Sequence, residues 1–400
     1  MPGFASRLER ARVGATVAMT VRARALRAAG ADVVMLTIGE PDFATPPHAI
    51  EAAHAAALRG ETKYPPQDGV PALKQAVQRK FARDHGLDVA AEEIIVGHGG
   101  KQVIFDALLA TVEQGDEVLI PAPYWSAYPL MTHTVGGTPT FVTCPQNNGF
   151  RLRAEDLDAA VTPRTRWLFL NFPNNPTGAA CSRDELAGIG RVMLRHPHVW
   201  ILSDDMYEHL VYDGFGYTTL AAVEPRLRDR VLTVSGVSKT YAMTGWRVGF
   251  AAGPRDLIRA MVNMQGQATA GVSPVAQAAA VAALDGPQEL VAERAAIYRA
   301  RRDLMVDRLN AIPGITCHRP EGAFYVFPDI AGCLGHVSAG GRRIDTDADF
   351  AEALLEEQHV ATVHGASFGM SPYLRLSYAT DTAALERGCA RIADFVAGLH

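Results

Sequence analysis

Short apolar runs alternate with helix-like segments through the central part of the chain, and this alternation limits the fold more than any other feature. The runs are rich in β-branched and aromatic residues, and they lie at residues 93–96, 118–120, 167–170, 199–202, 231–234 and 248–252. Strands that are separated by helices are typical of a mostly parallel sheet with both faces covered. The sequence therefore predicts an α/β fold in which helices sandwich this sheet.

The segments between the runs carry helix signals. Residues 71–85 begin with Pro71, show apolar residues at helical spacing, and are followed by Gly86, which can end a helix. Ser182 and Glu185 have the spacing of a capping box at the start of another helix.

The C-terminal part shows a different pattern. A long helical stretch after about residue 285 is followed by a strand-like run at 323–327, a Gly-rich loop, a helix near 349–357 and a second run at 373–378. This order predicts a smaller α+β domain, on which the N-terminal segment packs. We expect a large domain at residues 48–290 and a discontinuous small domain at residues 1–47 and 291–400.

Composition excludes several classes of protein. The net charge of −5 gives no reason to expect a nucleic acid or a membrane surface as partner. No apolar run has the length of a membrane span or of a signal-peptide core. The cysteines are odd in number and scattered, without metal-ligand spacing, so we expect reduced thiols in a cytoplasmic protein and no metal. They are Cys144, Cys181, Cys317, Cys333 and Cys389.

Lys239 is the residue that points most directly to chemistry. It follows the run at 231–234 after small and hydroxyl residues, and Arg247 comes eight positions later. A lysine that is desolvated at a strand end favours its neutral amine, which can form an imine with an aldehyde. A lone lysine in such a place is more often a surface residue, so the interpretation depends on the other strands.

Three other strands are also followed by polar groups, and ligands of open α/β sheets bind outside the carboxyl ends of the strands. The glycines within residues 97–100 follow the first run and lie at the start of a predicted helix, where their backbone amides can hold a phosphate. Asn175 is fixed between prolines after the third run, and Asp204 and Tyr207 follow the fourth. Asp204 alone could be a helix N-cap. A phosphate cradle, a pyridinium partner, a phenolate partner and an imine-forming amine together match pyridoxal phosphate.

At this point the chain resembles a known family. It is similar, over nearly its full length, to the class I aspartate aminotransferase family of fold-type I pyridoxal-phosphate enzymes, and most similar to the bacterial subgroup Ib. Eight motifs carry the resemblance in order: Ile38 to Phe43, Lys63 to Pro66, Gly99 to Gln102, Pro123 to Trp125, Asn174 to Gly178, Ser203 to Tyr207, Ser238 and Lys239 with Arg247, and Arg375 to Tyr378.

The resemblance implies roles around the cofactor ring. Lys239 would hold the cofactor as an imine and move the proton during catalysis. Asp204 would keep the pyridine nitrogen protonated, and Asn175 and Tyr207 would bond the 3-oxygen of the ring. Trp125 would stack on the ring face, although a buried tryptophan is often only part of a core. The catalytic set is Lys239, Asp204 and Tyr207.

The resemblance also implies how the phosphate and the substrate are held. The phosphate would be bound by Gly99, Gly100, the amide of Lys101, and Arg247. Tyr64 would reach the phosphate of a neighbouring subunit, which makes the functional unit a homodimer. Arg375 would grip the substrate α-carboxylate in bidentate fashion, with help from a backbone amide of Gly39. The substrate-binding set is Gly39, Lys101, Trp125, Asn175 and Arg375.

One position departs from the pattern of the family. Many relatives have a hydroxyl three residues before the lysine, against the phosphate, and this chain has Gly236 there. Ser235 or Ser238 could substitute, or the phosphate has one donor fewer.

The expected reaction is transfer of an amino group between an L-amino acid and a 2-oxo acid, in two half-reactions on one site. Lys101 is the candidate group for the distal carboxylate of an acidic substrate, which favours aspartate and glutamate with oxaloacetate and 2-oxoglutarate. The same branch contains enzymes for aromatic amino acids and for prephenate, and these substrates stay open.

Two further alternatives differ in kind. A carbon–sulfur β-lyase shares the lysine, asparagine and tyrosine motifs and would form pyruvate and ammonia without a keto-acid acceptor. A regulator built on this fold would need a DNA-binding helix-turn-helix ahead of it, and only about forty residues precede the predicted large domain. We therefore expect an enzyme of amino-acid metabolism.

Overall fold

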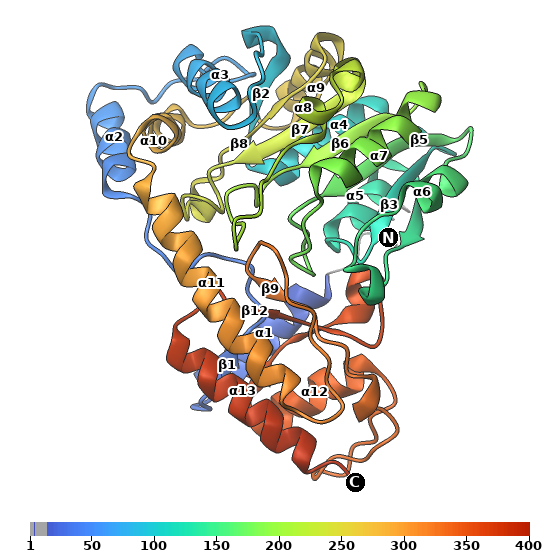
Figure 1. Cartoon of the computed structure of the whole chain (residues 1–400). Coiled ribbons are helices and arrows are strands. Elements are labelled where there is room, and N and C mark those ends of the chain that lie inside the picture. Colours follow the sequence, from blue (N-terminus) through green and yellow to red (C-terminus); the bar gives the residue numbers. More distant parts are fainter. Residues whose placement is uncertain (1–3, 5–13) are drawn as a thin grey trace.

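The computed structural model describes residue 4 and residues 14–400. Its main element is a seven-stranded sheet with nine helices packed around it (Figure 1). In spatial order the strands are β2 (Ile94–Gly97), β8 (Gly249–Ala252), β7 (Val231–Gly236), β6 (Trp200–Asp204), β5 (Thr165–Asn171), β3 (Glu117–Ala122) and β4 (Thr138–Thr143). All neighbouring pairs are parallel except those of β8, which runs antiparallel to both β2 and β7. The predicted mostly parallel α/β sheet is confirmed.

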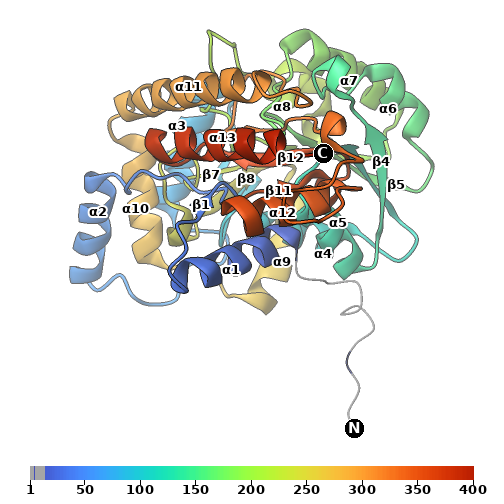
Figure 2. The same ribbon diagram turned by 90° about the horizontal axis from the view of Figure 1, so that it is seen from below.

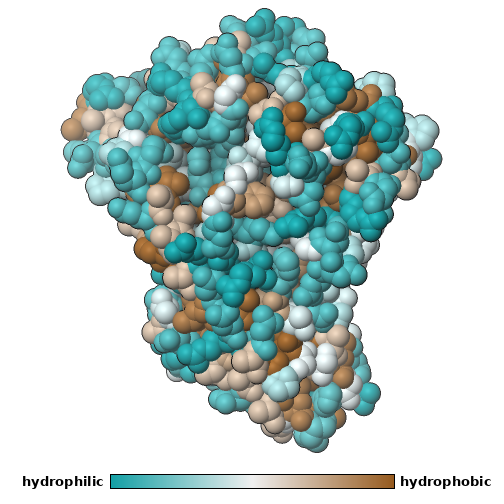
Figure 3. All heavy atoms as spheres, in the orientation of Figure 1, coloured by the Kyte–Doolittle hydropathy of each residue, from teal (hydrophilic) through white to brown (hydrophobic). Residues whose placement is uncertain are grey.

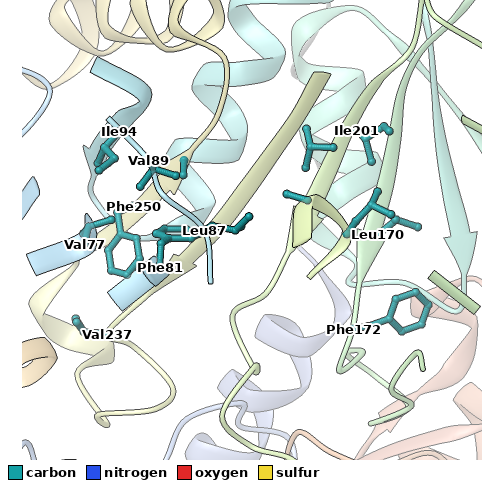
Figure 4. Close-up of a cluster of buried hydrophobic side chains, with 14 of the residues drawn as sticks. Val77, Phe81, Leu87, Val89, Ile94, Leu170, Phe172, Ile201, Val237 and Phe250 are labelled. Atoms are coloured by element: carbon teal, nitrogen blue, oxygen red, sulfur yellow. The ribbon is translucent and has the colours of Figure 1, made fainter. Parts of the chain in front are cut away.

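The strands are apolar throughout because both faces of the sheet are buried. Consecutive residues point to opposite faces: Leu168 and Ile201 belong to one hydrophobic cluster, and their neighbours Phe169 and Leu202 belong to another. Figure 4 shows the first cluster, in which Phe81 lies against Phe250 with ring centroids 6.4 Å apart.

The helices divide between the two faces according to these clusters. The first cluster takes side chains from α2 (Pro47–Leu58), α3 (Pro71–His85), α6 (Ala154–Ala160), α7 (Arg183–Arg195), α8 (Leu220–Val223) and α10 (Pro274–Asp285). The second takes them from α4 (Gly100–Thr111), α5 (Ala127–Val135) and α9 (Arg255–Ala268).

Local signals in the sequence explain where these helices begin and end. Helix α3 spans the predicted residues, with Pro71 in its first turn and Gly86 in a left-handed conformation at its C-terminus. The Ser182 hydroxyl accepts a hydrogen bond from the Glu185 amide at 3.3 Å, so the predicted capping box opens α7. The edge strand β4 was missed. Its sequence alternates threonine with Pro139 and a half-exposed Phe141, so it has no apolar run.

The C-terminal part packs around a third hydrophobic cluster, beside the larger body (Figure 1). Its helices are α11 (Glu289–Asn310), α12 (Asp347–Gln358) and α13 (Thr382–Ala397), and a three-stranded antiparallel sheet has the order β11 (Val363–His364), β12 (Leu374–Ser377), β9 (Tyr325–Val326). Helices α11 and α13 lie side by side in Figure 2. The molecular outline narrows between the two parts (Figure 3).

The N-terminal segment joins this C-terminal part. Helix α1 (Ala15–Ala28) contributes Met19 and Ala23 to the third cluster, and β1 (Val34–Met35) pairs in parallel with β10 (Val360–Ala361). The predicted division at residues 48–290 against 1–47 and 291–400 stays a prediction, and residues 1–3 and 5–13 of its first segment lie outside the described residues.

Candidate active site

The polar groups predicted at the strand ends meet at one edge of the sheet. Strands β5 and β6 are parallel, and their last residues, Asn171 and Asp204, are paired in register. The Asn171 side chain donates to the Asp204 carbonyl oxygen at 3.0 Å and accepts from the Asn175 amide at 2.9 Å. This pair of bonds fixes the asparagine loop against the end of β6.

Lys239 and Arg247 both lie in the connection between β7 and β8. Because these strands are antiparallel and Gly236 pairs with Gly249, residues 237–248 leave and re-enter the sheet at the same edge. Arg247 adopts a left-handed conformation with φ of 56° at the end of this connection. The antiparallel turn therefore brings two cations to the same place.

The Lys239 amine points toward the N-terminal segment. Its Nζ donates to the Gly39 carbonyl oxygen at 2.5 Å, and it lies 5.9 Å from the ring centroid of Tyr207 and 5.8 Å from that of Phe324. Burial lowers the pKa of Lys239 from 10.5 to about 8, helped by the charges of Arg375 and Arg247 and opposed by Glu40 and Asp204. The amine is thus easier to deprotonate than an ordinary lysine.

Asp204 is a buried carboxyl at the end of β6. Burial raises its pKa to about 6, against the effect of the Tyr128 hydroxyl, which donates to Oδ2 at 2.6 Å. The Met206 amide donates to Oδ1 at 3.3 Å. A carboxylate in this position can pair with a cationic ring nitrogen.

Arg375, on β12, reaches into the same edge from the smaller part of the molecule. Its Nη1 donates to the Asn175 side chain at 3.0 Å and its Nη2 to the Thr37 carbonyl oxygen at 2.6 Å. The guanidinium lies between two aromatic rings, 4.7 Å from the centroid of Tyr325 and 4.9 Å from that of Phe368. Its Nε is buried without a hydrogen-bond partner among the described residues.

Tyr207 is linked to this arginine through a second tyrosine. The Tyr207 and Tyr325 hydroxyls lie 2.8 Å apart, and both side chains are buried. Gly39 lies directly against this pair, because a Cβ there would come within 2.2 Å of the Tyr325 hydroxyl oxygen. Only a glycine leaves room for the backbone to pass.

The glycine turn before α4 lies beside Arg247. Gly99 has φ of 82°, and a Cβ on it would meet Arg247 Nη2 at 2.4 Å. A Cβ on Gly249 would meet the Gly100 amide nitrogen at 2.3 Å, so β8 passes close to the helix N-terminus. Free amides, a helix N-terminus and a guanidinium form a cradle that favours an anion.

Lys101 and Trp125 lie next to each other at this helix start. The Lys101 Nζ is 5.1 Å from the Trp125 ring centroid. Loss of surrounding water, together with the charge of Arg247, lowers the pKa of Lys101. A lysine in these surroundings is less strongly hydrated and more available to an acidic group.

Tyr64 and Gly39 have predicted roles that involve a second subunit and the substrate. The Tyr64 side chain is 93% exposed and makes no side-chain hydrogen bond within residues 14–400. The Gly39 carbonyl oxygen accepts from Lys239, and the contact predicted for the Gly39 amide is with the substrate carboxylate. The role of each stays a prediction.

Ser235 does not replace the missing hydroxyl at Gly236, because its hydroxyl donates to the Glu208 carboxylate. Ser238 is buried and has no side-chain hydrogen bond among the described residues, so it is the remaining candidate.

Tyr128 and Tyr325 are site residues that the sequence analysis missed. Each lies in an apolar segment, where an aromatic residue is typical of a core. Only their hydroxyl contacts distinguish them from core residues.

These residues fit pyridoxal phosphate. A Cβ on Gly99 would fill the cradle, and Asp204 is a buried carboxyl at a strand end. Arg375 Nε is a buried donor that has no partner in the part of the chain that the structure describes. The amine of Lys239 lies among them with a lowered pKa. The donor set thus offers a partner for the phosphate, for the ring nitrogen and for the aldehyde.

Comparison with known proteins agrees with this chemistry. The sequence model of the family described as aminotransferase class I and II matches residues 31–392. The aspartate/prephenate aminotransferase of Cereibacter sphaeroides is 54% identical over 392 residues, which cover 98% of each chain. The aspartate aminotransferase of Rhizobium meliloti is 52% identical and is covered over 95% of its length, with 97% of this chain aligned.

Solved structures show the same fold. The crystal structure of aspartate aminotransferase from Rhizobium meliloti superposes with a TM-score of 0.97 at 51% identity, with full coverage of both chains. The Thermus thermophilus aspartate aminotransferase, solved with maleate, gives 0.92 at 40% identity over 99% of this chain and 100% of the other.

Proposed function

The chain belongs to the class I and II aminotransferase family, and we propose that it uses pyridoxal phosphate to move amino groups between aspartate or glutamate and the matching 2-oxo acids. The observation that carries the proposal is the Lys239 amine, with its pKa lowered to about 8, at the same sheet edge as the buried carboxyl of Asp204. The names of the two relatives above support the acidic substrate.

The residues at the edge of the sheet would hold the cofactor by its polar groups. When bound, pyridoxal phosphate supplies an aldehyde that condenses with amines and a ring that takes up electrons from the substrate. Asp204 would bind the ring nitrogen, Asn175 and Tyr207 the 3-oxygen, and Trp125 the ring face. The phosphate would be held by Gly99, Gly100, the Lys101 amide and Arg247.

Lys239 Nζ would first hold the aldehyde and later carry the proton that leaves the substrate Cα. Its lowered pKa serves both tasks, because a neutral amine is both a nucleophile and a base. The hydrogen bond to the Gly39 carbonyl oxygen orients Nζ at the sheet edge.

Arg375 would bind the substrate α-carboxylate. The two aromatic rings keep its guanidinium plane fixed, and this geometry suits a bidentate contact. Lys101 would meet the distal carboxylate of a dicarboxylic substrate. The maleate with which the Thermus relative was solved is such a dicarboxylate.

Prephenate is a second candidate substrate, since it also carries two carboxylates. The relative from Cereibacter sphaeroides, at 54% identity, is named for both aspartate and prephenate. The carbon–sulfur lyase alternative lacks a supporting observation of this kind.

The assembly is proposed to be a homodimer with shared active sites. Ile50, Leu58 and Tyr64 are exposed in helix α2 and the loop after it, where a second subunit would cover them. We further propose the two-domain division stated above, supported by the separate hydrophobic clusters.

The cytoplasm is the proposed compartment. All five cysteines are free and buried, as is usual in a reducing environment. Among the described residues, no helix is both long enough and apolar enough to cross a membrane.

One experiment tests the function directly. The purified protein is mixed with pyridoxal phosphate, a panel of amino acids is added, and the visible spectrum and the 2-oxo acid products are followed. Aspartate and glutamate should react fastest, and Lys239→Ala should lose transfer entirely while still binding cofactor weakly. Full activity in Lys239→Ala would exclude the mechanism.

The acidic specificity is tested at Lys101. Lys101→Ala should lose rate with aspartate and glutamate far more than with phenylalanine, which lacks a second carboxylate and serves as the internal control. Equal losses for all three amino acids would contradict the role of Lys101.

A further inference from the structure

Tyr128 makes a hydrogen bond that no part of the proposed function uses. It lies in the first turn of α5, and its hydroxyl donates to Asp204 Oδ2 at 2.6 Å. Both side chains are buried. The contact joins a helix on one face of the sheet to the carboxyl at the end of its central strand.

The phenol of Tyr128 is held rigidly in this position. Trp125 packs edge-on to its ring at a centroid distance of 5.3 Å, and Phe169 does so at 5.1 Å. Burial and the adjacent Asp204 raise the pKa of Tyr128 well above its usual value, so the hydroxyl stays protonated and stays a donor. It cannot turn toward water without disturbing both rings.

The two oxygens of Asp204 are used unequally. Oδ2 accepts from the Tyr128 hydroxyl at 2.6 Å, and Oδ1 accepts from the Met206 amide at 3.3 Å. The longer contact leaves Oδ1 with capacity for another donor. Oδ1 is therefore the oxygen that is open to a ring nitrogen.

We propose that Tyr128 is a positioning residue that keeps the proton shared by Asp204 and the cofactor on the ring nitrogen. The inference rests on the proposed function. A hydrogen bond donated to a carboxylate stabilises its charged form and so lowers its affinity for a proton. Asp204 has a high proton affinity because it is buried, and Tyr128 opposes that effect. Without the hydroxyl, the carboxylate would compete better for the proton, and the ring would accept electrons less well.

The size of the effect follows from the kind of bond. One hydrogen bond to a charged group shifts a proton equilibrium by roughly 10- to 100-fold. In Tyr128→Phe, the ratio of pairs with the proton on the ring nitrogen to pairs with the proton on Asp204 should therefore fall by roughly 10- to 100-fold.

Tyr124 supplies a matched control. It lies four residues earlier, stacks on Phe141 at a centroid distance of 4.9 Å, and its hydroxyl has no hydrogen-bond partner among the described residues. Tyr124→Phe removes the same atom from the same segment without touching Asp204. It controls for general effects of losing a phenol hydroxyl near the sheet edge.

The test uses the holoenzyme loaded with pyridoxal phosphate labelled with ¹⁵N in the ring. The nitrogen chemical shift is recorded against pH for wild type, Tyr128→Phe and Tyr124→Phe, together with cofactor affinity and thermal unfolding. At neutral pH the ring-nitrogen shift of Tyr128→Phe should lie closer to that of an unprotonated ring than the wild-type shift does, kcat should fall by roughly 10- to 100-fold, and KM should change much less. Tyr124→Phe should titrate as wild type does.

Two results would overturn the inference and can be told apart. If wild type binds the cofactor and Tyr128→Phe shows the same nitrogen titration, only the role of Tyr128 is wrong. If wild type does not bind the cofactor, the proposed function is wrong as well. Should Tyr128→Phe fold poorly, 3,5-difluorotyrosine at position 128 makes a stronger donor of the same shape. It should move the ring-nitrogen shift at neutral pH toward that of a fully protonated ring, and no change or a change in the opposite direction would overturn the inference.

Discussion

At the scale of single residues, burial sets the acid–base behaviour of Lys239. Its pKa falls from 10.5 to about 8, while the nearby Glu40 carboxylate works in the opposite direction. Only the neutral amine attacks an aldehyde, so the reactive fraction falls about tenfold for each pH unit below this value. The lowered pKa thus makes the amine available near neutral pH.

The first prediction concerns the pH dependence of cofactor capture. The rate at which the apoprotein binds pyridoxal phosphate covalently should rise with pH through a midpoint near 8, measured by stopped-flow absorbance. Glu40→Gln removes a charge that raises this pKa, so its midpoint should lie lower. A midpoint near pH 10.5, or a shift upward in Glu40→Gln, would contradict this account.

The sequence predicted those site residues whose type is unusual at a strand end. Lys239, Asp204 and Asn175 are polar groups that follow apolar runs, and the sheet brings them to one edge. Tyr128 and Tyr325 could not be predicted, because a tyrosine among apolar residues packs equally well with or without a partner for its hydroxyl. The partner of Ser235, Glu208, depends on tertiary contacts that no local pattern reveals.

At the scale of elements, a buried cluster of charges joins α3 to the loop after β6. Lys80 Nζ donates to Glu208 Oε2 at 2.5 Å, and His85 Nε2 lies 2.6 Å from the same oxygen. The other Glu208 oxygen accepts from Ser235 on β7. Glu208 directly follows Tyr207, so the cluster supports the loop that begins directly after Asp204.

A metal ion is not needed to balance this cluster. Asp84, Glu208 and His209 bring three potential ligand atoms within 4.8 Å of one another, the one such group among the described residues. The ammonium of Lys80 already lies there, 3.5 Å from Asp84 Oδ2. Its positive charge balances the negative charges of the Asp84 and Glu208 carboxylates, as a bound cation would.

The second prediction is that Lys80→Met destabilises the fold strongly. Both side chains of the Lys80–Glu208 pair are 2% exposed, and removal of one partner from a buried pair costs about 3–5 kcal/mol. Arg79→Met is the matched control on the same helix, since the exposed Arg79–Asp285 pair should contribute only about 0–1 kcal/mol. Urea unfolding of both variants measures the difference.

Two outcomes would speak against the buried cluster. Equal unfolding midpoints for the two variants would show that the Lys80 pair contributes no more than a surface pair. The second outcome concerns stability at low pH, because the cluster holds the pKa of Glu208 well below its usual value. Its stabilisation is present above the ordinary glutamate pKa and is lost as the pH falls through the lowered pKa. The stability difference between wild type and Lys80→Met should therefore shrink in acid, and a constant difference would contradict the role of the cluster.

Element boundaries followed the strength of the local signals. Helix α3, which has a proline in its first turn and a glycine after its end, was predicted to the residue. Strand β4 was missed because it is half-exposed at the edge of the sheet and lacks an apolar run. The antiparallel direction of β8 was not predicted either, since strand direction depends on the path of the connection and not on the composition of the strand.

At the scale of the whole molecule, the candidate site lies where the large sheet with its covering helices meets the C-terminal part. Arg375 comes from β12, but its partners are Asn175 of the larger sheet and Thr37 of the N-terminal segment. Lys239, in the connection between β7 and β8 of the large sheet, likewise reaches Gly39 of the N-terminal segment. Neither part alone contains the full set of groups that the proposed reaction needs, so the reaction would use residues that are distant in sequence.

The last prediction concerns the second subunit. Tyr64 is 93% exposed in a single chain, and we propose that it acts in the site of the partner. Hybrid dimers are formed from one Lys239→Ala subunit and one Tyr64→Ala subunit, each with a different affinity tag.

If Tyr64 acts across the interface, one site of the hybrid has both defects and the other site has none. The hybrid should then bind one equivalent of cofactor with wild-type affinity and recover about half of the wild-type activity per dimer, by the two-fold symmetry. If Tyr64 acts within its own chain, the single competent lysine shares its site with the substituted tyrosine, and the hybrid has about half of the activity of the Tyr64→Ala homodimer per dimer, by the same symmetry.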